Sequence, residues 1–161
     1  MHKRLWRFSG AALLTIATGF LVSEADVLFG QEDQSGQPAA FTIDGEAALW
    51  TVAIKPDKTQ DFERVMTKLR EALLKSQKPE RQQLAAGWKL MKIDKAMPDG
   101  SIAYVHVISP VVRGADYTIL QILYDEFPDE RRALYDLYRG AFAKNMSLVS
   151  GAIVVDLSKT Q

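Results

Sequence analysis

The chain has 161 residues, of which 47% are hydrophobic and 25% are charged, which is the balance of one globular domain. Its 20 basic residues balance 20 acidic residues, so the composition gives no basic footprint for a nucleic acid. The sequence contains no cysteine, which excludes disulfides, thiolate metal ligands and a cysteine nucleophile.

The N-terminus has the organisation of a secretory signal peptide. Lys3, Arg4 and Arg7 precede an uncharged run at 8–22, and the small residues that end at Ala25 suit a cleavage site. The alternative is an uncleaved membrane anchor. The signal peptide is favoured because the run is short for the roughly 20 residues of a membrane-spanning helix. We therefore expect an exported protein, periplasmic or secreted, with no membrane contact after cleavage.

The rest of the chain divides by composition. Residues 26–46 are rich in Gly, Gln, Asp and Ser without a sustained period, which predicts a flexible leader. The remaining length suffices for one hydrophobic core and not for two. The sequence thus predicts four parts: a signal peptide (1–25), a leader (26–46), one compact domain (47–157) and a tail (158–161).

Within the domain, strands are predicted where apolar residues alternate, and helices where they recur every three or four positions. In chain order, the pattern predicts a strand at 48–56, a helix at 58–76, a helical turn at 78–87, strands at 88–94 and 101–109 joined by the turn 97–100, helical pieces at 115–127 and 128–145, and a strand at 147–157. Pro128 marks a kink or restart between the two helical pieces. The last strand is strongly β-branched, so we expect a central strand that is buried on both faces.

This order predicts an α+β domain of the ferredoxin-like βαββαβ type. Its four-stranded antiparallel sheet carries both helices on one face, with the first and third strands in the centre. The other face keeps large apolar residues, and a second copy of the same sheet is the simplest cover for them. We therefore expect a homodimer.

The element order, together with "LWTVAIKP", the "MPDG" hairpin and "SGAIVVDL", resembles the dimeric α/β-barrel superfamily over roughly residues 47–157. That superfamily includes cofactor-independent monooxygenases, haem-degrading enzymes, small-molecule isomerases and members of unknown activity. The resemblance implies a fold and a pocket between two paired sheets, and it does not imply a reaction. The export signal, the segment 78–87 and the divided second helix depart from the family pattern, and the last two would reshape the mouth of the pocket.

His106 is the only histidine outside the first two residues, and alternation places it on the same strand face as Tyr104. The opposite face carries small β-branched residues that suit packed helices, so we expect His106 and Tyr104 to face away from the helices, between the sheets. There His106 could act as a base while Tyr104 orients a substrate. The alternative is a hydrogen bond across the sheet or the dimer contact.

Trp50 and Trp88 also lie on predicted strands, where either could stack on a flat apolar ligand. Packing in the dimer core is the alternative for each. One histidine without a second ligand at metal-binding spacing predicts no metal site, and neither a phosphate loop nor a Gly-x-Ser-x-Gly motif is present. We expect no cofactor.

The interpretation is an exported α/β-barrel domain that binds a small apolar or aromatic molecule in an inter-sheet cavity through Trp50, Trp88 and His106. One alternative is a cofactor-independent monooxygenase or isomerase with His106 as the base and Tyr104 beside it. The other is a structural homodimeric module without a ligand. The sequence leaves the question of enzymatic activity open.

Overall fold

The computed structural model describes residues 40–158, apart from the side chain of Asn145. The predicted signal peptide and most of the predicted leader lie outside the described residues. The elements, in chain order, are β1 (Ala47–Ile54), η1 (Pro56–Lys58), α2 (Thr59–Lys75), α3 (Pro79–Gly87), β2 (Trp88–Lys92), β3 (Ile102–Ile108), α4 (Ile119–Glu126), η2 (Pro128–Glu130), α5 (Arg131–Ala141) and β4 (Phe142–Gly151), where η denotes a short 3-10 helix.

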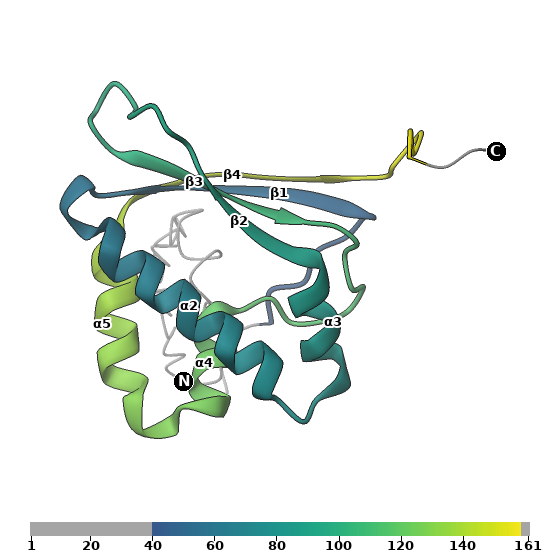
Figure 1. The fold of residues 1–161 in the computed structure, drawn as a ribbon, viewed down its shortest axis with the longest axis horizontal. Helices are drawn as coiled ribbons and strands as arrows, with labels where there is room; N and C mark the ends of the chain where they lie inside the picture. Colours follow the sequence, from purple (N-terminus) through teal and green to yellow (C-terminus); the bar gives the residue numbers. More distant parts are fainter. Residues whose placement is uncertain (1–39, 159–161) are drawn as a thin grey trace, which may run out of the picture.

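The strands form one antiparallel sheet in the order β2-β3-β1-β4. The first and third strands are therefore central, as the sequence predicts. All the described helices lie on one side of the sheet, and no described helix covers the other side (Figure 1). The domain is α+β, and its architecture is compatible with the ferredoxin-like type.

The local elements follow the sequence patterns closely up to α5. The helical turn at α3 and the division of the second helix at Pro128 are both confirmed. The turn before β3 is closed by a 2.8 Å hydrogen bond from the Gly100 amide to the Met97 carbonyl oxygen. Gly100 adopts a φ of 80°, a left-handed conformation that glycine reaches without steric cost.

The final strand differs from the prediction. The strand predicted at 147–157 is present as far as Gly151, but its predicted central position is wrong, because β4 lies at the edge of the sheet. It also begins earlier, at Phe142, directly after α5. Pairing along the full length of β1 draws residues 142–151 into the sheet. The following residues run beyond the sheet, where Val154 and Leu157 are 93% and 94% exposed.

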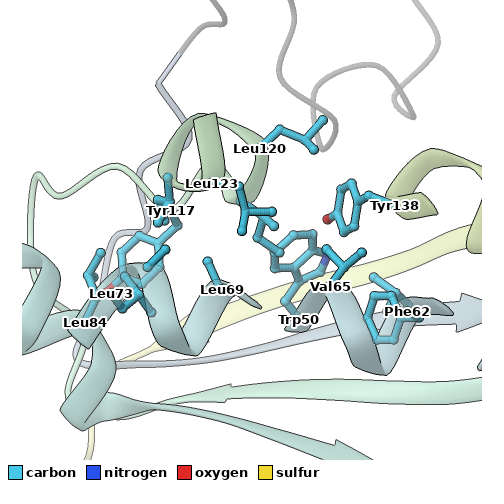
Figure 2. Packing of buried hydrophobic residues seen from close by; sticks show 14 of the residues in the cluster. Trp50, Phe62, Val65, Leu69, Leu73, Leu84, Tyr117, Leu120, Leu123 and Tyr138 are labelled. Atoms are coloured by element: carbon cyan, nitrogen blue, oxygen red, sulfur yellow. The ribbon is translucent and has the colours of Figure 1, made fainter. Parts of the chain in front are cut away.

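The hydrophobic core fills the layer between the sheet and the helices. Helix α2 contributes Phe62, Val65, Leu69 and Leu73 at helical spacing, and they pack over the large apolar side chains of β1 (Figure 2). Close packing of this kind leaves one face of β1 and β3 in the core and the other face toward solvent. Alternation along these strands then decides which residues reach the helices.

The packed part of the chain begins before Ala47, the predicted domain boundary. The Phe41 amide donates to Asp116 Oδ1 and Thr118 Oγ1, each at 3.0 Å, and Ile43 is buried in the core. Residues 41–46 therefore hold the loop before α4 against the domain. Across residues 40–158, no helix combines the length and the apolar content that a membrane span requires.

Candidate functional site

His106 and Tyr104 point into the helix-covered layer. The prediction that this face looks away from the helices is wrong, since the His106 and Tyr104 rings both lie beside the ring of Phe62 from α2. The strand register explains the result, because His106 stands opposite Trp50, the largest core residue of β1. Bulky aromatic side chains, rather than small β-branched ones, occupy the space beneath the helices.

His106 is enclosed by aromatic rings. It stacks on Trp50 with ring centroids 4.6 Å apart, and the Trp88 indole Nε1–H donates to its Nδ1 at 3.0 Å. Only 1% of the residue is exposed. Its other ring nitrogen, Nε2, is buried and has no hydrogen-bond partner among the described residues.

This environment fixes the protonation state of the ring. Burial lowers the pKa of His106 from 6.5 to about 3, because the charged imidazolium would lose its hydration. The ring is therefore neutral near pH 7. Since Nδ1 accepts a hydrogen bond, the proton of the neutral ring resides on Nε2, which makes Nε2–H an unsatisfied donor.

A pocket of about 410 Å³ opens between α2 and β2 and reaches His106. Its volume falls within the range of small-molecule sites, about 300–1,000 Å³. Most of the wall is apolar, with Met66, Leu69, Leu73, Ala85, Trp88 and Leu90. Four polar residues complete the lining: Glu63, Thr67, Arg70 and Lys89.

The pocket follows from the sheet topology. Strand β2 is an edge strand, and the register places Trp88 and Leu90 on the same face as His106. On the helix side of β2, the pocket is lined by α2 and by the last turn of α3. Sequence reasoning missed this pocket, because the spacing of residues does not report how far a helix lies from an edge strand.

Tyr104, two residues before His106 on β3, belongs to a polar cluster with Glu63 and Lys92. Its hydroxyl donates to Glu63 Oε1, which also accepts a 2.9 Å hydrogen bond from Lys92 Nζ. The Tyr104 hydrogen bond is the main cause that lowers the pKa of Glu63, while burial raises the pKa of Tyr104. Tyr104 does not line the pocket, so the expected pairing of Tyr104 with His106 at one ligand is not seen.

The two predicted tryptophans have different places. Trp88 is half-buried and lines the pocket, whereas Trp50 is 1% exposed and lies behind His106 in the core. Trp50 Nε1 is also buried without a hydrogen-bond partner in the described chain. Of the predicted binding residues, the structure brings Trp88 and His106 together at the pocket and leaves Trp50 as their support.

The chemistry available at this site is recognition of an apolar body by shape, together with hydrogen bonds from the polar residues of the wall and from His106. A base whose conjugate acid has a pKa of about 3 is poorly matched to proton abstraction near neutral pH. Within residues 40–158, no three His, Cys, Asp or Glu side chains are grouped so that they could hold a metal ion.

Comparisons with known proteins found no matching family model, no similar curated protein and no similar solved structure. The fold and the site define the class of the protein as a small α+β domain with an antiparallel sheet and a pocket on the side of the sheet that faces the helices.

Proposed function

We propose that the protein binds a small apolar or aromatic molecule in the pocket between α2 and β2. The observation that carries the proposal is a largely apolar pocket of about 410 Å³ that ends at a buried histidine with an unsatisfied nitrogen. An unpaired buried donor costs roughly 1–3 kcal/mol, which an acceptor atom on a ligand would relieve. This site replaces the inter-sheet cavity as the place for the ligand.

The chemistry of the walls describes the ligand. Trp88 offers an indole face for a flat ring, and Met66, Leu69 and Leu90 enclose an apolar body. A carbonyl, ether or hydroxyl oxygen on that body would accept from His106 Nε2–H after a small shift of the side chains that bury this nitrogen. Binding, rather than catalysis, is favoured because the neutral histidine is a weak base in this environment.

Two variants, each with one α3 alanine replaced by phenylalanine, test the proposal. Ala85 lines the pocket, whereas Ala86 is exposed and is not a lining residue. The assay is a thermal-shift and calorimetric screen of aromatic ketones, phenols and short-chain esters against wild type, Ala85→Phe and Ala86→Phe. We expect compounds that bind wild type and Ala86→Phe but bind Ala85→Phe at least about tenfold more weakly, a difference of about 1.4 kcal/mol. Equal binding to all three proteins would place the ligand elsewhere.

A homodimer through the uncovered sheet face is a second part of the proposal. This open face carries Leu49, Thr51, Met91, Val105, Val107 and Val149. Leu49, Met91 and Val149 are 50%, 48% and 63% exposed, and the strand register places them beside the half-buried valines Val105 and Val107 of β3. Large apolar patches of this kind mark interfaces, and the face-to-face sheet pairing of a dimeric α/β barrel would cover it.

Sedimentation equilibrium tests the dimer. Leu49→Lys places a charge in the middle of the open face, and Leu74→Lys places the same charge at an exposed position on α2. We expect wild type and Leu74→Lys to sediment as dimers and Leu49→Lys as a monomer. A monomeric wild type at high concentration contradicts the dimer and leaves the ligand proposal standing. Export remains a prediction that rests on residues 1–25.

A further inference from the structure

A second pocket lies at the N-terminal end of α3. It has a volume of about 530 Å³ and is lined by residues from the start of α3, the loop before α4 and α4 itself. The cations on its wall are Lys78, Arg81 and Arg113, and the acids are Glu80, Asp116 and Asp125. The wall therefore holds as many cationic as acidic side chains. The ligand that the pocket suits depends on which of these side chains already form ion pairs or hydrogen bonds within the protein.

Arg81 is the residue of interest in this pocket. Its side chain is only 7% exposed, and its Nη2 contacts Asp125 Oδ2 at 3.2 Å. Its Nη1 is buried and has no hydrogen-bond partner among the described residues. A guanidinium carries five N–H donors in a fixed planar fork, so a single contact leaves most of this fork unused.

Asp125 does not accept hydrogen bonds from the remaining N–H groups of Arg81. Its Oδ2 also accepts from Lys78 Nζ at 2.8 Å, and its Oδ1 accepts from Gln121 Nε2 at 2.7 Å. One carboxylate thus faces two cations, which leaves a positive charge in excess beside Arg81. Arg81 Nη1 therefore remains a donor without an acceptor among the described residues, in a side chain that lines the pocket.

Neither of the other two acids on the wall forms an ion pair with Arg81 within the described chain. Asp116 Oδ1 already accepts from the backbone amides of Phe41 and Thr118, so it serves the loop. Glu80 is an exposed residue of the first turn of α3 and shows no contact with Arg81. Arg113, which lines the pocket from the loop, adds a cation that has no ion pair within the described chain.

We infer that this second pocket binds the carboxylate or phosphate group of a small anionic molecule, with Arg81 as its principal ligand-binding residue. An oxyanion beside Nη1 satisfies the buried fork and balances the charge that Lys78 and Arg81 leave in excess over Asp125. Arg113 then holds the outer side of the anion. This site is independent of the proposed function, since the α2–β2 pocket contains none of these residues.

The test is a titration of the purified full-length protein at constant ionic strength, with inorganic phosphate in one arm, acetate in a second and chloride in a control arm. Binding is followed by calorimetry and by the backbone and arginine resonances of the ¹H–¹⁵N spectrum. We expect saturable binding of phosphate or acetate that shifts the resonances of Arg81 and Gly114. The arm that saturates at the lower concentration identifies the chemical source of the anion.

Three substitutions make the test specific. Arg81→Lys keeps a charge for Asp125 but lacks the planar fork, and we expect it to weaken anion binding roughly tenfold or more. Arg113→Gln removes an exposed cation and is expected to weaken binding without affecting the fold. Arg132→Lys, at an exposed position on α5, is the matched control and should bind as wild type does.

The proposal is overturned if neither anion saturates beyond the chloride control, or if Arg81→Lys binds as tightly as wild type. Circular dichroism establishes whether Arg81→Lys is folded. Should that variant fail to fold, Arg113→Gln decides the question, and an unchanged affinity in Arg113→Gln overturns the proposal.

Discussion

The burial of His106 predicts a specific loss of stability in mild acid. The folded state holds a pKa of about 3 at this ring, against 6.5 for an exposed histidine. Between pH 6.5 and about pH 3, the unfolded state therefore binds a proton at His106 that the folded state does not bind, and unfolding is favoured. The contribution of the neutral His106 ring to the free energy of unfolding is fully present above pH 6.5, and it is lost as the pH falls from 6.5 toward 3.

The magnitude follows from the two pKa values. The full difference of about 3.5 units corresponds to about 5 kcal/mol, at about 1.36 kcal/mol per unit. Between pH 7 and pH 5 the expected loss is about 2 kcal/mol, because protonation of the unfolded state is then well advanced.

Urea unfolding at pH 7, 6 and 5 measures the effect, with His106→Gln as the matched variant. Glutamine does not titrate, and its side-chain oxygen can still accept from the Trp88 indole. We expect wild type to lose about 2 kcal/mol relative to His106→Gln over this range, because the carboxylates common to both proteins cancel. Parallel stability curves for the two proteins would refute the burial of a neutral His106.

Further predictions concern backbone space, core packing and the polar cluster. Gly87→Ala should lose about 1–3 kcal/mol, because its added Cβ would lie 2.6 Å from a backbone carbonyl oxygen, whereas Gly140→Ala meets no atom within 4 Å and should be neutral or stabilising; thermal unfolding compares the two. Phe62→Ala should cost about 3–5 kcal/mol in urea unfolding, since the ring is fully buried among four other aromatic rings. Tyr104→Phe should raise the pKa of Glu63 toward its usual value, which an NMR titration of the carboxyl carbon detects, and an unchanged pKa would contradict the hydrogen bond.

The order of elements could be predicted from sequence because it depends on local periodicity. Alternation identifies β1 and β3, and helical spacing identifies α2, without any knowledge of the packing. Alternation also groups Tyr104 with His106 correctly on one face. It does not say which face meets the helices, since that choice depends on the volume beneath α2, where the structure places Trp50 and His106 together.

The end of the chain shows a different limit. The β-branched segment at 147–157 predicts a buried strand by propensity, yet only its part up to Gly151 pairs with β1, because Phe142–Gly151 already occupies the full length of β1. Strand propensity reflects packing on a sheet, so it gives no account of a segment that lies beyond the sheet. Arg81 was likewise not recognised, because its burial arises from contacts between α3 and α4 that are 44 residues apart in sequence.

The central claim is that a ligand occupies the pocket between α2 and β2 beside Trp88 and His106. A ¹H–¹⁵N titration with the tightest compound of the screen tests it most directly, because the Trp88 indole N–H that donates to His106 gives a resolved signal. The account predicts saturable shifts of that signal and of the α2 and β2 amides that line the pocket. Shifts confined to Leu49, Val107 and the rest of the open face would contradict it.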